Sequence, residues 1–215
     1  NRSMLTLEQA RSWYPDGDPV HNFEHVERVY HLANQLAIAE GADLEIIRTA
    51  ALLHDAQPPS DNYTPQREEH HQAAAAFACR ELAEQGWSTE RIDAVEHAIL
   101  AHRYRDEQSE PLTLEAQVLF DADKLDAIGA VGVARAIAFC VMAGEPFYDT
   151  PSAHFIQTGK TLPAEAHSAY HEYTFKLRKI KPRLYTVTGR KLAEKRHELM
   201  TAYFQQLQAE MEGAF

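Results

Sequence analysis

The stretch Leu44-Glu-Ile-Ile-Arg-Thr-Ala-Ala-Leu-Leu-His54-Asp55 carries the clearest structural signal in the sequence. Its apolar residues recur at helical spacing, and the row that begins at Leu44 and Ile47 ends on His54. Residues three and four positions apart share one face of an α-helix. The stretch therefore predicts a buried helix whose last turn carries an imidazole on the face turned to the core. A carboxylate, Asp55, follows immediately.

Four other predicted helices also place an ionisable side chain on a row that should be buried. The row beyond His25, for example, continues with Val29, Leu32 and Leu36. The ionisable members of the four rows are His25, His71, His102 and Asp123. Unpaired carboxylates and imidazoles are costly to bury, and a divalent cation is the simplest partner for both. Separate core histidines, each hydrogen-bonded to a carbonyl, are the alternative explanation.

Helical periodicity extends along almost the whole chain, and strand-type alternation is almost absent. Polar or proline-containing joints separate the helices. The expected helices cover residues 23–41, 44–55, 69–85, 88–102, 113–142, 165–180 and 189–212, with an irregular connection over 144–163. We therefore predict an all-α fold with a single domain over 1–215. Its core covers about 18–142, and its C-terminal helices cover about 165–212.

Composition narrows the class of protein further. The chain has 215 residues and a formal charge of −11, which disfavours binding to nucleic-acid polymers and anionic membranes. Its two cysteines, Cys79 and Cys140, lie within apolar helical patterns, so we expect no disulfide framework and a reducing compartment. No apolar run reaches the roughly 18 residues of a membrane span, and no signal-peptide pattern precedes the first helix. These features predict a cytoplasmic protein without a membrane partner.

Three motifs, in order along the chain, resemble those of the HD-domain metal-dependent phosphohydrolase superfamily. They are His21-x-x-x-His25-x-x-Arg28-Val29, Leu52-Leu53-His54-Asp55 and the aspartate-rich segment from Asp121 to Arg135. The segment from Val95 to His102 and the later Phe175-Lys176-Leu177 are similar to one branch, the uncharacterised or nucleotide-directed HD hydrolases. The resemblance covers about residues 18–205. It implies an HD-domain helical bundle with a smaller C-terminal helical extension.

The resemblance also implies which residues hold the metal. It transfers the ligand roles to His25, His54, Asp55 and Asp123, around one divalent ion. Asp121 competes with Asp123 because both lie on apolar rows, and periodicity does not separate them. The setting Ala122-Asp123-Lys124-Leu125 matches the family pattern and favours Asp123. Asp121 and Asp126 are then expected to support the ligands or to cap helices. Mixed His and Asp ligation suits Mn, Fe, Ni or Zn better than calcium, and Mg stays open.

With such an ion, the implied activity is hydrolysis of phosphate esters or anhydrides of small molecules, with nucleotides favoured by the branch. Asp55 is expected to bind the metal and to orient a water molecule. His102 is the candidate for acid–base work or phosphate contact, although a bond to a buried carbonyl explains it equally well. We expect His97 to be structural. The substrate-binding candidates are His21, Arg28, Lys124 and Lys176.

Two alternatives stay open at this level. A second ion held by His71, His97 or His102 would make the protein a dinuclear phosphodiesterase or a di-iron oxygenase. The paired histidine expected of the phosphodiesterases is missing at His97-Ala98, which weakens that alternative. The second alternative is a non-catalytic, metal-stabilised interaction module. The sequence does not indicate an oligomeric state.

Overall fold

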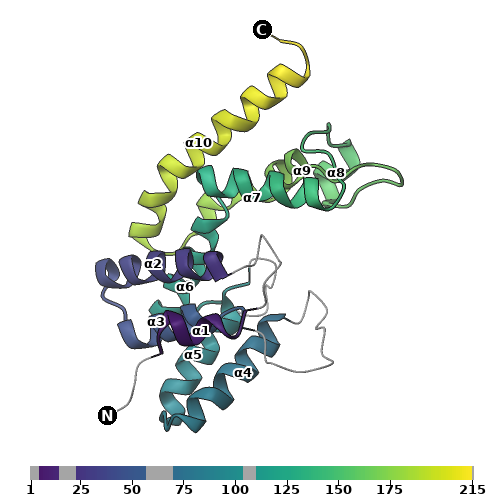
Figure 1. Ribbon diagram of the computed structural model, residues 1–215. Helices are drawn as coiled ribbons and strands as arrows, with labels where there is room; N and C mark the ends of the chain where they lie inside the picture. Colours follow the sequence, from purple (N-terminus) through teal and green to yellow (C-terminus); the bar gives the residue numbers. More distant parts are fainter. Residues whose placement is uncertain (1–4, 15–22, 57–69, 104–109, 215) are drawn as a thin grey trace. The chain divides into compact units, whose positions relative to one another are not determined.

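The computed structural model describes residues 5–14, 23–56, 70–103 and 110–214 (Figure 1). The α-helices are α1 (Leu7–Arg11), α2 (Phe23–Glu40), α3 (Leu44–Leu53), α4 (His70–Glu84), α5 (Thr89–Ala101), α6 (Leu114–Asp126), α7 (Gly129–Met142), α8 (Ala153–Thr158), α9 (Ala169–Phe175) and α10 (Val187–Met211). Two short 3-10 turns, Leu177–Lys179 and Lys181–Arg183, precede α10. The described residues contain no strand, so the all-α prediction is confirmed.

Residue contacts divide the chain into two compact units. The first comprises Asn1–Lys124 and Tyr185–Gly189, and the second comprises Leu125–Leu184 and Arg190–Phe215. The divisions fall inside α6 and near the start of α10, so both helices contribute to both units. The expected core over about 18–142 therefore does not coincide with one unit. A single domain over 1–215 stays a prediction.

The first unit is organised around α3, which is buried on most sides. Seven of its ten residues are buried, and its two charged residues, Glu45 and Arg48, are half-buried. The helices α2 and α5 pack against α3, and α4 packs against α5. Asp43 caps the start of α3, and Arg91 of α5 pairs with Asp43 at 3.1 Å and with Glu45 at 2.6 Å. These contacts fix the helix whose far end carries the histidine–aspartate pair.

The helix α1 has no counterpart among the predicted helices, because its five residues are too few to establish a helical repeat. Its start is stabilised by a capping box between Thr6 and Gln9, in which each side chain accepts the backbone amide of the other residue. Beyond its end, the ring of Trp13 packs edge-on against Phe77 of α4, with centroids 5.4 Å apart. The helix is therefore tied into the first unit.

The prediction of one continuous helix over 113–142 is wrong, because the chain forms two helices, α6 and α7. It leaves helical geometry at Ile128, whose φ of −126° and ψ of 167° are extended. Gly129 follows with a φ of +80°, a conformation that glycine adopts without steric strain. A Cβ atom on Gly132 would lie 2.2 Å from the carbonyl oxygen of Ala127. Both glycines are required for the break, but apolar periodicity continues across it and masks it.

In the second unit, α9 packs against α7 and α8. Two further predictions are wrong here: the connection 144–163 contains α8, and the helix expected over 165–180 is limited to α9 followed by 3-10 turns. The cause is Glu165, whose carboxylate accepts the backbone amides of Ser152 at 2.8 Å and Leu162 at 2.6 Å. These bonds stabilise the backbone before α9 and leave Glu165 outside it.

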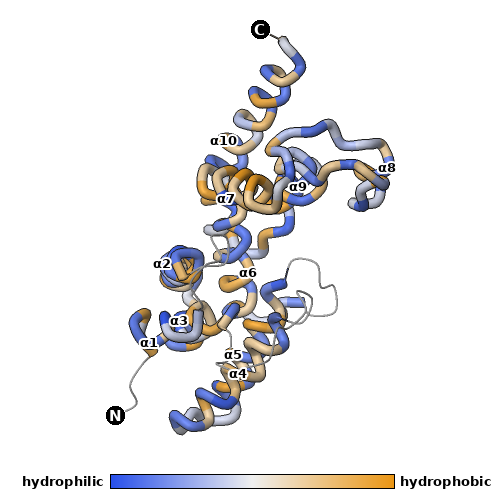
Figure 2. Tube along the Cα trace, turned by 45° about the vertical axis from the view of Figure 1, so that its right-hand side comes forward, coloured by the Kyte–Doolittle hydropathy of each residue, from blue (hydrophilic) through white to orange (hydrophobic). Residues whose placement is uncertain are grey.

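Helices α7 and α10 both contribute buried apolar side chains to the second unit. Figure 2 shows α7 as a largely apolar helix, coloured orange. The helix α10 buries Ala193, Met200 and Phe204, and the ring of Tyr173 stacks on Phe204 with centroids 4.5 Å apart. In the described part of the chain, no single helix is both long and apolar enough to cross a membrane; α6 and α7 pass that test only as a broken pair.

Candidate metal centre

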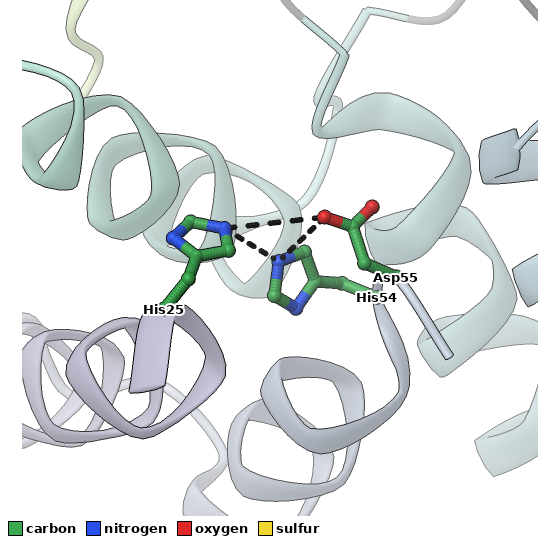
Figure 3. A group of neighbouring side chains, drawn as sticks. All are labelled: His25, His54 and Asp55. Atoms are coloured by element: carbon green, nitrogen blue, oxygen red, sulfur yellow. Dashed lines mark hydrogen bonds and ion pairs between the residues drawn. The ribbon is translucent and has the colours of Figure 1, made fainter. Parts of the chain in front are cut away.

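Three ligand-bearing side chains meet between α2 and the end of α3 (Figure 3). His25 projects from α2, whereas His54 and Asp55 follow the last residue of α3. The Nε2 atoms of His25 and His54 are 3.4 Å apart. The Oδ2 atom of Asp55 lies 3.9 Å from the first and 3.5 Å from the second. Among the described residues, this is the one group of three whose geometry could hold a metal ion.

Backbone carbonyls orient two of the imidazoles. His54 Nδ1 lies 2.8 Å from the carbonyl oxygen of Ala51, and His102 Nδ1 makes the corresponding short contact with Ile99. A ring that donates from Nδ1 leaves Nε2 as the acceptor or ligand atom. His102 Nε2 lies 3.6 Å from Asp55 Oδ1. The carbonyl contact proposed as an alternative for His102 is therefore present, and it also turns the other nitrogen toward Asp55.

Asp123 of α6 approaches the same group through one oxygen. Its Oδ1 lies 3.4 Å from His25 Nε2, and its Oδ2 pairs with Lys124 Nζ at 2.6 Å. Lys124 is itself buried, with its ammonium 5.3 Å from the ring centroid of Phe120. Sequence reasoning assigned Lys124 to the substrate and did not anticipate this ion pair with its neighbour.

The electrostatics of the group favour ionised carboxylates and a neutral ring at His54. Burial opposes ionisation of Asp55, but the electrostatic interaction with His54 and the hydrogen bond shared with His102 hold the pKa of Asp55 far below its ordinary value. Burial acts likewise on Asp123, where the charge of Lys124 and the hydrogen bond from His25 lower the pKa well below the usual range. Burial also lowers the pKa of His54, which favours the neutral ring.

This donor set fits a borderline divalent metal. Neutral imidazole nitrogens and ionised carboxylate oxygens are the ligands that Mn, Fe, Ni and Zn accept together. Two ligands come from adjacent positions, His54 and Asp55, and the others from separate helices. An ion bound here would therefore link α2, α3 and α6 within the first unit.

Asp121 has a different environment from Asp123. Its fully buried carboxylate accepts the backbone amides of Tyr185 at 2.9 Å and Thr186 at 2.8 Å, and the Thr186 hydroxyl at 2.6 Å. A Cβ atom on Gly189 would lie 2.4 Å from Asp121 Oδ2. The carboxylate thus stabilises the chain at the start of α10, while Asp123 lies beside His25. Asp126, the third aspartate of the segment, pairs with Arg135 of α7 at 2.5 Å.

The remaining predicted residues are distributed around both units. His97 accepts the backbone amide of Leu112 at 3.1 Å, a structural contact as expected. Arg28 is half-buried on α2, one turn after His25, and His71 is buried in the first turn of α4. Lys176 belongs to the second unit, where its ammonium lies 3.8 Å from Glu172. His21 lies outside the described residues.

Comparison with known proteins gives the family. The HD domain family matches residues 22–128, a range that contains all four proposed ligands. YpgQ of Bacillus subtilis is 34% identical over 223 residues, covering 99% of this chain and 97% of YpgQ. The chain belongs to the HD-domain family. The resemblance noted in the sequence is therefore confirmed.

Solved structures of several bacterial proteins share the fold over nearly the whole chain. The crystal structure of B. subtilis YpgQ in complex with ADP has a TM-score of 0.71 at 32% identity, covering 98% of this chain and 100% of YpgQ. A protein from Lactobacillus plantarum has a TM-score of 0.76 at 29% identity, covering 96% and 95%. An HD-superfamily hydrolase from Bacillus thuringiensis has a TM-score of 0.66 at 25% identity, covering 96% of each chain. The fold is thus that of the HD-superfamily hydrolases.

Proposed function

We propose that the protein is a divalent-metal-dependent phosphohydrolase that acts on phosphate esters or anhydrides of small molecules, with nucleotides as the favoured class. The observation that carries this proposal is the convergence of His25, His54 and Asp55, with Asp123 Oδ1 3.4 Å from His25 Nε2. The proposed cofactor is one ion of Mn, Fe, Ni, Mg or Zn. Bound there, it would polarise a phosphorus–oxygen bond and make hydroxide available near neutral pH.

The residues around the four ligands supply the rest of the chemistry. Asp55 has one oxygen toward the two histidines and the other toward His102, so it is placed to orient a water molecule. His102, held by its carbonyl contact, is placed to accept or donate the proton. Arg28 and Lys124 carry positive charge close to the ligands in sequence, and in this proposal they contact the phosphate. His21 and Lys176 stay substrate-binding candidates.

The nucleotide class is supported by the relative that was crystallised with ADP, which shares 32% identity with this chain. A diphosphate offers both a phosphoanhydride bond and a chain of anionic oxygens for a metal and cations to bind. The proposed partner is accordingly a small phosphorylated molecule in the cytoplasm, with neither a nucleic-acid polymer nor a membrane. The dinuclear alternative loses one of its ligands, because the ring of His97 bonds the backbone of Leu112.

The test combines metal content with phosphate release. Purified protein should bind one equivalent of Mn²⁺ and release phosphate from nucleotides or a generic aryl phosphate. His25→Ala should reduce both properties, whereas His31→Ala, which changes an exposed histidine on the same helix, should alter neither. Stoichiometric metal without turnover of any phosphorylated compound would instead favour an interaction module or an oxygenase.

A further inference from the structure

The turn that presents His54 and Asp55 is held by a set of carbonyl contacts. The last four carbonyls of a helix have no partner within that helix. At the end of α3, Ala51 is bonded to the ring of His54, and Leu53 accepts a backbone amide three residues further on, at 3.1 Å. Between them, Leu52 accepts the hydroxyl of Tyr14 at 2.8 Å. Tyr14 lies far away in sequence, just beyond α1.

Tyr14 contacts this turn with a buried and protonated hydroxyl. The residue is 7% exposed. The hydroxyl thus donates to the carbonyl of Leu52, two residues before His54.

The ring of Tyr14 also reaches the other ligand-bearing helix. It packs against Phe23, with centroids 5.7 Å apart, and Phe23 lies two residues before His25 at the start of α2. Tyr14 therefore contacts both segments that supply the imidazoles. A side chain that holds two ligand-bearing segments in register fixes the distance between their ligands.

We propose that Tyr14 is a positioning residue of the metal centre, whose hydroxyl fixes the turn after α3 so that His54 and Asp55 face His25. The inference rests on the proposed function in one respect, that the group is a metal centre. Tyr14 itself touches neither the metal nor the substrate. The helix α1 thereby becomes part of the site's scaffold.

The decisive variant is Tyr14→Phe, which keeps the ring against Phe23 and removes only the hydroxyl. Calorimetric titration with Mn²⁺ should show about tenfold weaker binding, the size typical when a residue that orients metal ligands is changed. At saturating Mn²⁺, kcat for an aryl phosphate should fall while KM changes little, because the phosphate contacts are intact. Circular dichroism checks that the variant is folded, and the titration is repeated in the cold if its melting temperature has dropped.

Two matched variants separate positioning from general stability. Tyr170→Phe removes a hydroxyl that bonds Gln208 at 2.6 Å in the second unit, and it should leave Mn²⁺ affinity unchanged. Trp13→Phe disturbs the packing of the same N-terminal segment without touching Leu52, and it should lower stability more than affinity. Wild-type Mn²⁺ affinity in Tyr14→Phe, or an equal loss in Trp13→Phe, overturns the inference.

Metal binding and turnover are scored separately, so the two proposals fail in different ways. If the wild type binds Mn²⁺ but hydrolyses no phosphate, the proposed function fails and the role of Tyr14 is still decided by the titrations. If Tyr14→Phe binds and turns over like the wild type, the role of Tyr14 fails and the proposed function stands. If the wild type binds no divalent metal, both are overturned.

Discussion

Among the described residues, His54 and His171 are fully buried beside carboxylates, and their surroundings differ. In the second unit, His171 uses both ring nitrogens within its own segment, on Ser168 Oγ at 2.8 Å and on Glu165 Oε1 at 3.3 Å. In the first unit, His54 uses Nδ1 locally but turns Nε2 toward His25 and Asp55. Burial beside a carboxylate is common to both, so burial alone does not identify a metal centre.

The difference lies in where the partners come from. The partners of His171 lie three and six positions away, and Glu165 also accepts two backbone amides, so this cluster completes the local backbone structure. The partners of His54 Nε2 include a side chain from another helix, and several ligand atoms face one another without a backbone group between them. The first arrangement stabilises a loop, whereas the second leaves donor atoms available to an ion.

The largest expected effect that distinguishes the surroundings of His54 from those of His171 is on phosphate release. Asp55→Ala should lower phosphate release by about a thousandfold, because it removes both a proposed ligand and the group that orients water. Metal content of the purified variant, measured by elemental analysis, should fall in parallel. His171→Phe should keep its metal, and equal losses in the two variants would contradict the distinction between the clusters.

The next largest effect is that of His171→Phe on the free energy of unfolding. His171→Phe removes the ring nitrogens that bond Ser168 and Glu165, and the buried backbone amide of Ser168 loses its partner on Nδ1, so the free energy of unfolding should fall by about 1–3 kcal/mol. Urea denaturation followed by circular dichroism measures it. If this variant lost more free energy of metal binding than free energy of unfolding, the His171 cluster would contribute to the metal centre, against the comparison.

The two cysteines, one in each unit, report which unit a variant disturbs. Burial, followed by the charges of Glu172 and Glu145, raises the pKa of Cys140 to about 11. Burial, together with the charge of Glu96, raises the pKa of Cys79 to about 11 as well. Both thiols should therefore react slowly with iodoacetamide at neutral pH, since thiolate is the reactive form.

In His171→Phe, Cys140 should be alkylated faster than in the wild type while Cys79 is unaffected. Its thiol bonds the carbonyl oxygen of His167 at 3.5 Å, within the segment that this variant loosens. Peptide mass spectrometry resolves the two sites. Faster alkylation of Cys79 alone would show that His171→Phe disturbs the first unit, against the prediction.

The smallest expected effect is on the pH dependence of stability, through Glu165, the carboxylate that bonds His171. Backbone amides of Leu162 and Ser152 lower the pKa of Glu165 from 4.5 to about 2. A lowered folded-state pKa means that the stabilisation is complete above about pH 4.5 and is lost as the pH falls toward 2. The stability difference between the wild type and Glu165→Gln should shrink over that interval in urea denaturation. A difference that is constant with pH would show that charge at Glu165 does not matter.

The inward-facing histidine candidates followed from periodicity alone. His25, His54 and His102 lie on rows that an amphipathic helix must bury, and the structure buries all three. Periodicity left both Asp121 and Asp123 as candidates, and the motif resemblance favoured Asp123, which lies beside His25. These features were predictable because helix spacing fixes which side chains share a face.

Other features depend on contacts that spacing does not encode. Asp121 and Asp123 occupy equivalent apolar rows, and only the amides of Tyr185 and Thr186, far along the chain, distinguish them. The helix break at Ile128 was hidden because the apolar pattern runs through it. Tyr14 was overlooked because a five-residue helix has no repeat that marks its buried face.

The sequence by itself therefore determined the helical class, the family and the set of ionisable side chains that must turn inward, since all of these follow from local spacing and from motif order. Only the tertiary structure decided which of those side chains face one another, which carboxylate serves the backbone at the start of α10 instead, and how the turn after α3 is held. Those choices depend on hydrogen bonds between residues distant in sequence, and such bonds exist only once the helices have packed.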